Sequence, residues 1–238
     1  MAFMDKNIKE RDLMVLRFRS TQAIIGDGYK LFFNNFRHIF RASWLAAIVY
    51  AVSMGLVGWH FMSLPELSLT SAGIIAFYLF SAALLASTAF DALHEHKQAG
   101  VISRPRHWYG RLSVKSFLKM IKTVFRMIKH ISLAFPHLGM LFVVLLMTAI
   151  VTLLFTLIGQ LPAIVLTIAN IQAHAGFAEG DSLGLPDNIG IINFATFTVT
   201  GFIQAFIHLT TVFPLYYAWG SIKAQKQANK NETTPPVH

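Results

Sequence analysis

The chain has 238 residues, of which 55% are hydrophobic and only 13% are charged. Soluble domains carry about 25% charged residues, so this composition argues against a soluble enzyme or a disordered tail. The 20 Lys and Arg residues outnumber the 11 Asp and Glu residues, and the mean hydropathy is +0.54. These figures predict an integral membrane protein with basic surfaces. The chain contains no Cys, which excludes disulfides, thiolate metal sites and cysteine nucleophiles.

The first predicted element is a basic amphipathic helix over residues 22–41. Apolar and aromatic side chains recur on one side of this helix: Ile25, Tyr29, Phe32, Phe33, Phe36 and Phe40. Polar side chains occupy the other side: Asp27, Lys30, Asn34, His38 and Arg41. Such a helix lies in the plane of a membrane surface, with its rings in the acyl boundary and its cations toward the head groups.

Four later stretches are long enough to cross the hydrocarbon core, which takes about 20 apolar residues. They cover residues 42–62, 72–90, 137–159 and 189–219, and none of them contains Asp, Glu, Lys or Arg. We expect Pro214 to kink or end the last helix. Small side chains repeat every fourth residue along the first stretch, which lets helix backbones approach closely: Ser43, Ala47, Ala51 and Gly55.

Residues 161–177 are harder to place, because they are short for a crossing and carry Asn170, Gln172 and His174. They fit a fifth crossing, a re-entrant segment or an interfacial helix. Lys and Arg fall in three blocks, over residues 1–41, 91–130 and 223–230, whereas the two remaining connections carry only acids: Glu66, Glu179, Asp181 and Asp187. Because cytoplasmic loops collect Lys and Arg, this pattern favours four crossings with both termini and the tail at 223–238 in the cytoplasm.

A second basic amphipathic helix is predicted over residues 112–132. Its cations follow a 4, 3, 4, 3 spacing along one face: Lys115, Lys119, Lys122, Arg126 and Lys129. This face is a candidate site for anionic lipid or an acidic partner. The alternative is that it only orients the crossings. We expect no nucleic-acid binding, because no reading module accompanies these cations.

The last crossing carries a polar stripe with steps of three or four residues: Asn193, Thr196, Thr200, Gln204, His208 and Thr211. Polar side chains in hydrocarbon face protein or water, so we expect this stripe to point into the bundle. The stripe fits either hydrogen bonding between helices or a substrate path in which His208 is the titratable member. No intramembrane Asp, Glu, Lys or Arg accompanies it, which favours the packing role.

We expect no cofactor and no bound metal. The candidate ligands for a metal lie just after the second crossing: Asp91, His94, Glu95 and His96. Their spacing matches no zinc motif of the H-E-x-x-H type, and a solvated helix end explains the cluster equally well. The chain also has no Walker loop, nucleophile elbow or dinucleotide-binding fingerprint.

Two aromatic-rich motifs flank the predicted membrane region, at residues 28–44 (GYKLFFNNFRHIFRASW) and at residues 213–217 (FPLYY). They resemble motifs in bacterial polytopic membrane proteins, and related arrangements occur in the membrane-domain family attached to some glycerophosphodiester phosphodiesterases. The resemblance implies a location in the bacterial cytoplasmic (inner) membrane and no established activity.

The sequence as a whole predicts an all-α membrane bundle over residues 1–238, with four transmembrane helices and two interfacial helices. We expect a non-enzymatic protein that interacts with membrane lipids, anionic ones in particular, or that assists membrane assembly with a membrane-protein partner or a second copy of itself. One alternative is a small transporter or channel subunit that uses the polar stripe. Another is a membrane enzyme that uses the residues from Asp91 to His96.

Overall fold

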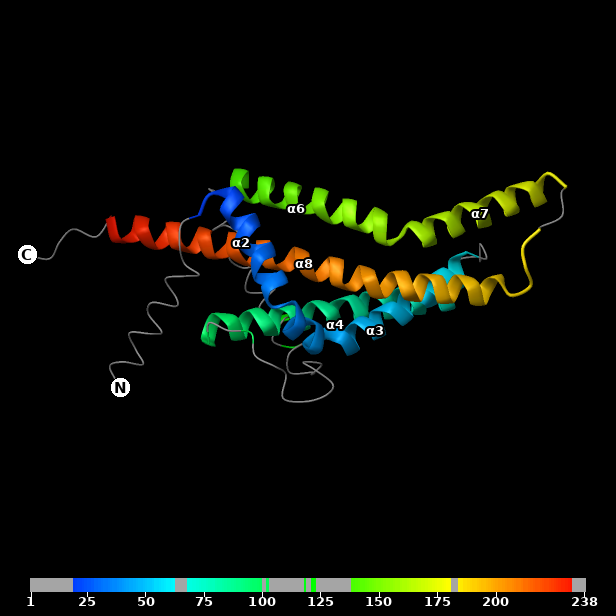
Figure 1. The fold of residues 1–238 in the computed structure, drawn as a ribbon, viewed down its shortest axis with the longest axis horizontal. Coiled ribbons are helices and arrows are strands. Elements are labelled where there is room, and N and C mark those ends of the chain that lie inside the picture. The colour runs from blue at the N-terminus through cyan, green and yellow to red at the C-terminus, as the bar shows by residue number, and fades with distance from the viewer. Residues whose placement is uncertain are drawn as a thin grey trace, which may run out of the picture. The chain divides into compact units, whose positions relative to one another are not determined.

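The computed structural model describes residues 19–62, 68–99, 102, 118, 121–122, 138–180 and 184–232. All the elements of these residues are α-helices: α2 (Thr21–Asn34), α3 (Phe36–Phe61), α4 (Leu69–Ala99), α6 (Leu138–Gly159), α7 (Leu161–Ala178) and α8 (Ile189–Glu232) (Figure 1). The predicted all-helical class is confirmed for the described residues. Five of these helices, all except α2, are long and apolar enough to span a membrane.

The region expected to form one amphipathic helix over residues 22–41 is divided at Asn35. The Asn35 side-chain amide donates a hydrogen bond to the carbonyl oxygen of Leu31 at 3.0 Å, and its backbone N–H also faces the last turn of α2. Asn side chains compete with helix propagation in this way and end helices. The following helix, α3, therefore begins at Phe36 rather than at residue 42.

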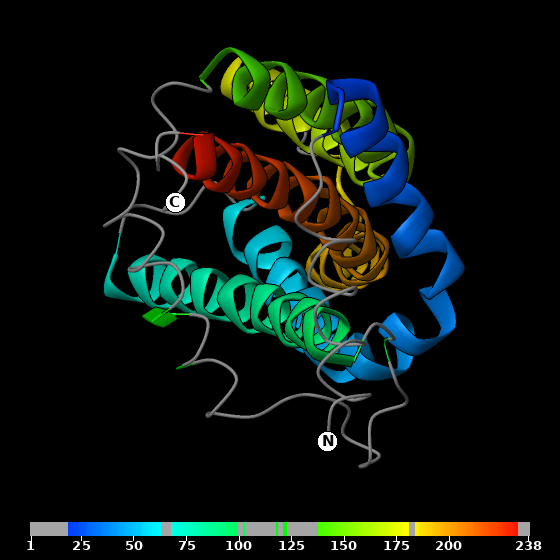
Figure 2. The same cartoon turned by 90° about the vertical axis from the view of Figure 1, so that its left-hand side faces the viewer.

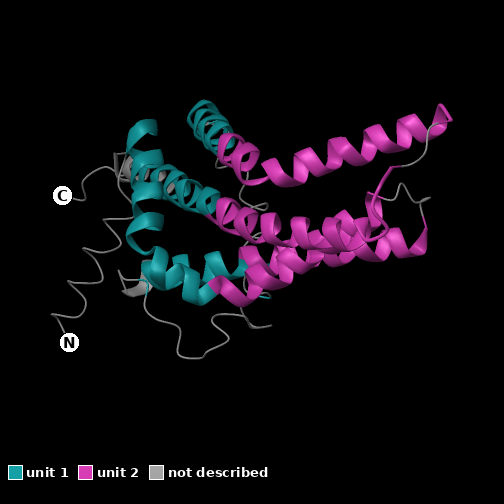
Figure 3. Ribbon diagram, turned by 45° about the vertical axis from the view of Figure 1, so that its right-hand side comes forward, with its two compact units in different colours: residues 1–42, 87–151, 210–238 teal, residues 43–86, 152–209 magenta. Residues whose placement is uncertain are grey.

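The chain packs as two compact units (Figure 3). Unit 1 comprises Met1–Ala42, Ser87–Val151 and Thr210–His238, and unit 2 comprises Ser43–Ala86 and Thr152–Leu209. Helices α3, α4, α6 and α8 contribute residues to both units, whereas α2 belongs to unit 1 and α7 to unit 2.

In unit 2, α3 packs closely and antiparallel against α8. Gly55 of α3 lies against Phe194 and Thr198 of α8, and Gly201 of α8 lies against Ala51 and Met54 of α3. Residue numbers therefore rise along one helix as they fall along the other. The predicted small-residue stripe contributes directly to this interface, because Ala51 and Gly55 are buried there.

Helix α7 continues in the direction of α6. Along unit 2, Thr156, Gln160 and Asn170 hydrogen-bond in turn to Gln204, to the backbone of Thr200 and to Asn193 of α8. A return of the chain at Gln160 would have reversed this order of partners. The backbone N–H of Gln160 still donates to Thr156, at 2.8 Å, so the helical path passes through the junction (Figures 1 and 2).

In unit 1, α2 packs on the C-terminal part of α8 and on α6. Ile24 of α2 forms a buried cluster with Val144 of α6 and with Tyr217 and Ala218 of α8. The ring of Phe32 meets the ring of Phe213 edge-on at a centroid distance of 5.3 Å. Pro214 does not end α8, which continues to Glu232. Its ring instead provides the surface on which Gly28 of α2 rests.

Candidate functional site

Most of the predicted lipid-binding face lies outside the described residues. This is the case for Lys115, Lys119, Arg126 and Lys129. Lys122 is described, and it is an exposed residue of a helical segment. The anionic-lipid site over residues 112–132 therefore stays a prediction.

The candidate metal ligands all lie on the last turns of α4. His94 is exposed, and Asp91, Glu95 and His96 are half-buried. The imidazole of His96 stands edge-on to the ring of Tyr216 at a centroid distance of 6.3 Å, which is an aromatic packing contact. Within the described part of the chain, no three His, Cys, Asp or Glu side chains gather into a set that could hold a metal ion.

The polar stripe of α8 is for the most part directed into unit 2. Asn193, Thr200 and Gln204 are buried. Asn193 accepts a hydrogen bond from Asn170 of α7 at 3.3 Å, and Gln204 donates one to Thr156 of α6 at 3.0 Å. The hydroxyl of Thr200 donates to the carbonyl oxygen of Thr196 in its own helix.

The two remaining residues of the stripe differ from this pattern. His208 is exposed at the surface of unit 2, and Thr211 belongs to unit 1. The six residues that share one face of α8 by spacing therefore do not line one continuous path in either unit.

The stripe instead joins polar groups from other helices at one level of unit 2. Gln204 contacts both Thr156 of α6 and the imidazole of His208, at 3.0 Å each. The His208 ring stands edge-on to Tyr50 of α3 at 6.1 Å, and the Tyr50 hydroxyl lies 3.2 Å from that of Tyr78 on α4. We call these five residues the polar belt. It connects side chains from four helices.

The side-chain amide of Gln204 is not fully satisfied. Its Nε2 lies 3.0 Å from both Thr156 Oγ1 and His208 Nε2. The Oε1 atom is buried and has no partner within the described residues. A buried acceptor without a partner costs about 1–3 kcal/mol.

Two other polar contacts pin α3 to α4 in the same unit. The hydroxyls of Ser53 and Ser81 lie 2.7 Å apart, and His60 Nε2 lies 2.8 Å from the Ser71 hydroxyl. Polar pairs of this kind add modestly to helix association in a membrane, by about 0.6 kcal/mol each on average. Their positions fix which residues of the two helices face each other.

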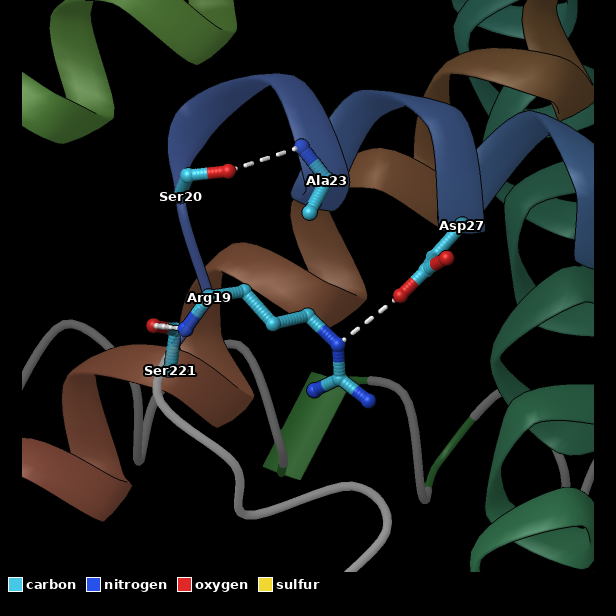
Figure 4. A network of polar contacts seen from close by, with 5 residues as sticks. All are labelled: Arg19, Ser20, Ala23, Asp27 and Ser221. Carbon is cyan, nitrogen blue, oxygen red and sulfur yellow. Dashed lines mark hydrogen bonds and ion pairs between the residues drawn. The ribbon is translucent and has the colours of Figure 1, made fainter.

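Unit 1 contains a polar cluster that the sequence pattern does not predict (Figure 4). Arg19 Nε donates to Asp27 Oδ2 at 2.9 Å, and the Arg19 backbone N–H donates to the Ser221 hydroxyl of α8 at 3.2 Å. The guanidinium carbon of Arg19 lies 4.8 Å from the centroid of the Tyr217 ring. Ser20 accepts from the backbone N–H of Ala23 and so caps α2.

The cap at Ser20 has a sequence signal, because Ser is a preferred residue immediately before a helix. The ion pair has none, since Arg19 lies outside the helix that carries Asp27. This cluster holds the first turns of α2 to α8. On the same helix, burial raises the pKa of the Tyr29 hydroxyl above its ordinary value, so this group stays neutral.

No family model, curated protein or solved structure matches this chain. The resemblance of residues 28–44 and 213–217 to bacterial membrane proteins therefore rests on those two short motifs and stays a prediction. The positions of the charged and polar side chains in the two units are therefore the features that bear on the choice between a lipid-interacting protein, a transporter and an enzyme.

Proposed function

We propose that this chain is a four-pass protein of the bacterial inner membrane in which unit 2 spans the bilayer and the cation-bearing segments face the cytoplasm. In this proposal the protein is not an enzyme. It binds anionic lipid and serves as a lipid-interacting or assembly component of the membrane.

The distribution of charge between the two units is the observation that supports this proposal best. The residue ranges of unit 2 contain no Lys or Arg, and all 20 such residues lie in the ranges of unit 1. The only charged residues in the ranges of unit 2 are four acids: Glu66, Glu179, Asp181 and Asp187. The units are defined by packing and the charges by sequence, so their agreement is independent support for a bilayer-spanning body with cytoplasmic cations.

The α3 and α4 segments of unit 2 match the thickness of a bilayer in length. Residues 43–61 of α3 and residues 69–86 of α4 each extend roughly 27–28 Å at the rise of an α-helix. A hydrocarbon core is about 30 Å thick. Each of these segments is therefore long enough for one crossing, with its ends at the two interfaces.

The path of α7 favours an even number of crossings. Because the order of hydrogen-bond partners on α8 continues across Gln160, α6 and α7 follow one direction along α8. A fifth crossing requires the chain to reverse between α6 and α7. The contacts therefore support a single crossing within the path of α6 and α7 and a return by α8.

The surface of unit 2 is suited to lipid rather than water. Large apolar side chains on α6 and α7 are exposed, among them Leu153, Phe155, Val165 and Ile171. Soluble monomers rarely expose apolar patches larger than a few hundred Å². Acyl chains cover such helix faces at no cost, so this surface supports a transmembrane position.

Single-cysteine labelling tests the topology, because the chain has no Cys of its own. We expect a membrane-impermeant maleimide added to intact cells to label Asp187→Cys but not Lys226→Cys, which reacts only after permeabilisation. The cysteine-free parent is the control. A five-crossing chain predicts the opposite result at both positions, and that result would overturn the proposal.

Lipid analysis tests the function. We expect protein extracted in mild detergent to retain phosphatidylglycerol or cardiolipin in excess over its share of the membrane, and to lose that excess at high salt. Retained lipid that mirrors the bulk membrane composition would contradict a lipid-interacting role.

The polar belt favours one second candidate, a small transporter or channel subunit. Its supporting observation is the exposed His208 beside the buried, unsatisfied Oε1 of Gln204. Proton flux into liposomes loaded with a pH-sensitive dye separates the two functions. A flux above that of protein-free liposomes that is abolished in both His208→Leu and Gln204→Leu would support transport, and the absence of flux would favour the lipid-interacting role.

A further inference from the structure

We infer that α2 and the first turn of α3 form a binding surface for the phosphate head groups of anionic lipid. Three aromatic rings and two cations make up this surface, which we call the α2 outer face: Phe33, Phe36, Phe40, Lys30 and Arg37. The inference rests on the proposed function, since it assigns lipid recognition to described residues outside the segment 112–132.

The rings of the α2 outer face are exposed and adjacent. Phe33, Phe36 and Phe40 have 60%, 42% and 38% of their surface exposed. Phe36 lies 6.0 Å from Phe40 between ring centroids, and the buried Phe32 contacts both Phe33, at 5.5 Å, and Phe36, at 5.7 Å. The three rings therefore form one aromatic surface that is supported from below by Phe32.

The opposite face of α2 fixes how this surface is presented. Ile24, Gly28 and Phe32 are buried against the other helices of unit 1. A methyl group on Gly28 would lie 2.6 Å from the backbone of Pro214, so the two helices are already at the limit of approach. With the inner face packed and Arg19 bound to Asp27, α2 has no freedom to turn its outer rings inward.

The charge of the α2 outer face suits phosphate. Lys30, on α2, and Arg37, on α3, are both exposed, and they lie on either side of the division at Asn35. Asp27 is already paired with Arg19 at 2.9 Å, and the next acid along the chain is Glu66. The two cations therefore have no competing carboxylate along the chain from residue 28 to residue 65.

The position of this surface matches the membrane interface. It directly precedes and includes the start of α3, which is the first helix able to span the bilayer. At such a site aromatic rings lie at the acyl boundary, and Lys and Arg reach the phosphates. Rings alone would anchor α2 in any lipid, whereas the two cations add a preference for anionic head groups.

Site-specific photo-crosslinking in nanodiscs tests the inference on the full chain. p-Benzoylphenylalanine is placed at position 36, at the start of α3. The matched control carries it at position 34, where Asn34 is the exposed last residue of α2. In discs of equal phosphatidylglycerol and phosphatidylcholine, we expect lipid adducts at position 36 with an excess of phosphatidylglycerol, and few adducts at position 34.

Charge removal then separates anchoring from recognition. We expect the phosphatidylglycerol excess at position 36 to fall about fivefold for each of Lys30→Gln and Arg37→Gln. The control Lys226→Gln, which lies outside both candidate lipid surfaces, should leave it unchanged. Raising the salt from about 50 mM to about 500 mM should reduce the same excess in the unsubstituted protein, which avoids any effect of substitution on folding.

The outcomes distinguish this inference from the proposed function. Absence of lipid adducts at position 36, adducts to another protein, or a phosphatidylglycerol excess that ignores both salt and charge removal would overturn the inference. If the purified protein still retained anionic lipid, the proposed function would stand and the site would lie elsewhere. If the unsubstituted protein retained no excess of anionic lipid after purification, the proposed function itself would be overturned.

Discussion

Gly28 of α2 lies in close contact with α8. An ideal Cβ at this position would lie 2.6 Å from both the Cα and the nitrogen of Pro214, and 2.9 Å from its Cγ. These atoms belong to the α8 backbone and to the rigid ring of Pro214, so they move less easily than a flexible side chain would. Gly28 is therefore required for close packing and not for backbone flexibility.

We expect Gly28→Ala to destabilise the protein by about 1–3 kcal/mol, because overpacking forces α2 away from α8. Thermal unfolding in detergent measures the loss. Gly26→Ala is the matched control, since a Cβ at Gly26 meets nothing within 4 Å and Ala is the better helix former. Equal melting temperatures for the two variants would contradict the packing described for α2.

Arg19 acts through the shape of its guanidinium group as well as its charge. Its side chain is 12% exposed, and it joins Asp27 to the ring of Tyr217. We expect Arg19→Lys to lower stability by about 1 kcal/mol, because an ammonium group loses the planar stacking and the fixed Nε donor. Arg37→Lys, at an exposed position, should leave the melting temperature unchanged in the same assay.

At the scale of elements, the antiparallel contact of α3 with α8 depends on small residues from both helices. Ala51 and Gly55 come from α3, and Gly201 comes from α8, with a constructed Cβ only 2.8 Å from that of Met54. Lipid tails are as apolar as helix surfaces, so the hydrophobic effect does not drive helices together in a membrane. Close packing of this kind stabilises their association instead. The interface therefore depends on the absence of side-chain volume at these positions.

Gly201→Leu should disrupt this interface and reduce the yield of folded, monodisperse protein. Gly73→Leu on α4 provides the control, since nothing lies within 4 Å of a Cβ there. Size-exclusion chromatography and circular dichroism at rising temperature compare the variants. A normal profile for Gly201→Leu would show that α3 and α8 do not approach as closely as described.

The pairing of α7 with α8 depends on an amide contact rather than on small residues. Asn170 and Asn193 are both buried, and their side chains meet at 3.3 Å. We expect a double-mutant cycle with Asn170→Leu and Asn193→Leu to give a coupling free energy of about 0.6 kcal/mol. The cycle of Asn170→Leu with Gly73→Ala should be additive. A cycle without coupling for the two Asn residues would contradict the proposed path of α7 along α8.

At the scale of the whole molecule, the dominant feature is the separation of charge between the residue ranges of the two units. In the proposed topology, the unit that spans the bilayer has no cations, which leaves its apolar surface to acyl chains. We expect the cation-bearing segments to be attracted to anionic lipid, and salt screens such an attraction over about 10 Å at 0.1 M. The proposal therefore predicts that the stability of the protein depends on lipid charge.

We therefore expect a higher melting temperature in nanodiscs of phosphatidylglycerol than in nanodiscs of phosphatidylcholine at low salt. The difference should shrink as the salt is raised, because the attraction acts between exposed charges. Discs made from lipids of equal chain length control for hydrophobic thickness. A difference that persists unchanged at high salt would point to packing against acyl chains and not to charge.

The sequence by itself determined the all-α class, the approximate positions of the long apolar helices and the segregation of the cations. These features depend on hydropathy and charge over windows of about 20 residues, which are local properties of the chain. The same local reasoning missed the division at Asn35, because one side-chain amide at that position ends a helix whose apolar spacing continues on both sides.

Only the tertiary structure decided which polar groups meet. Spacing placed six polar residues on one face of α8, but their partners come from α6, α7 and α3, at sequence separations that no periodicity reports. The neighbours Phe32 and Phe33 show the same limit, because one is buried at 2% exposure and the other is 60% exposed. The exposure of the two rings differs because α8 packs against one side of α2. The local sequence pattern does not give the position of a helix that is distant along the chain.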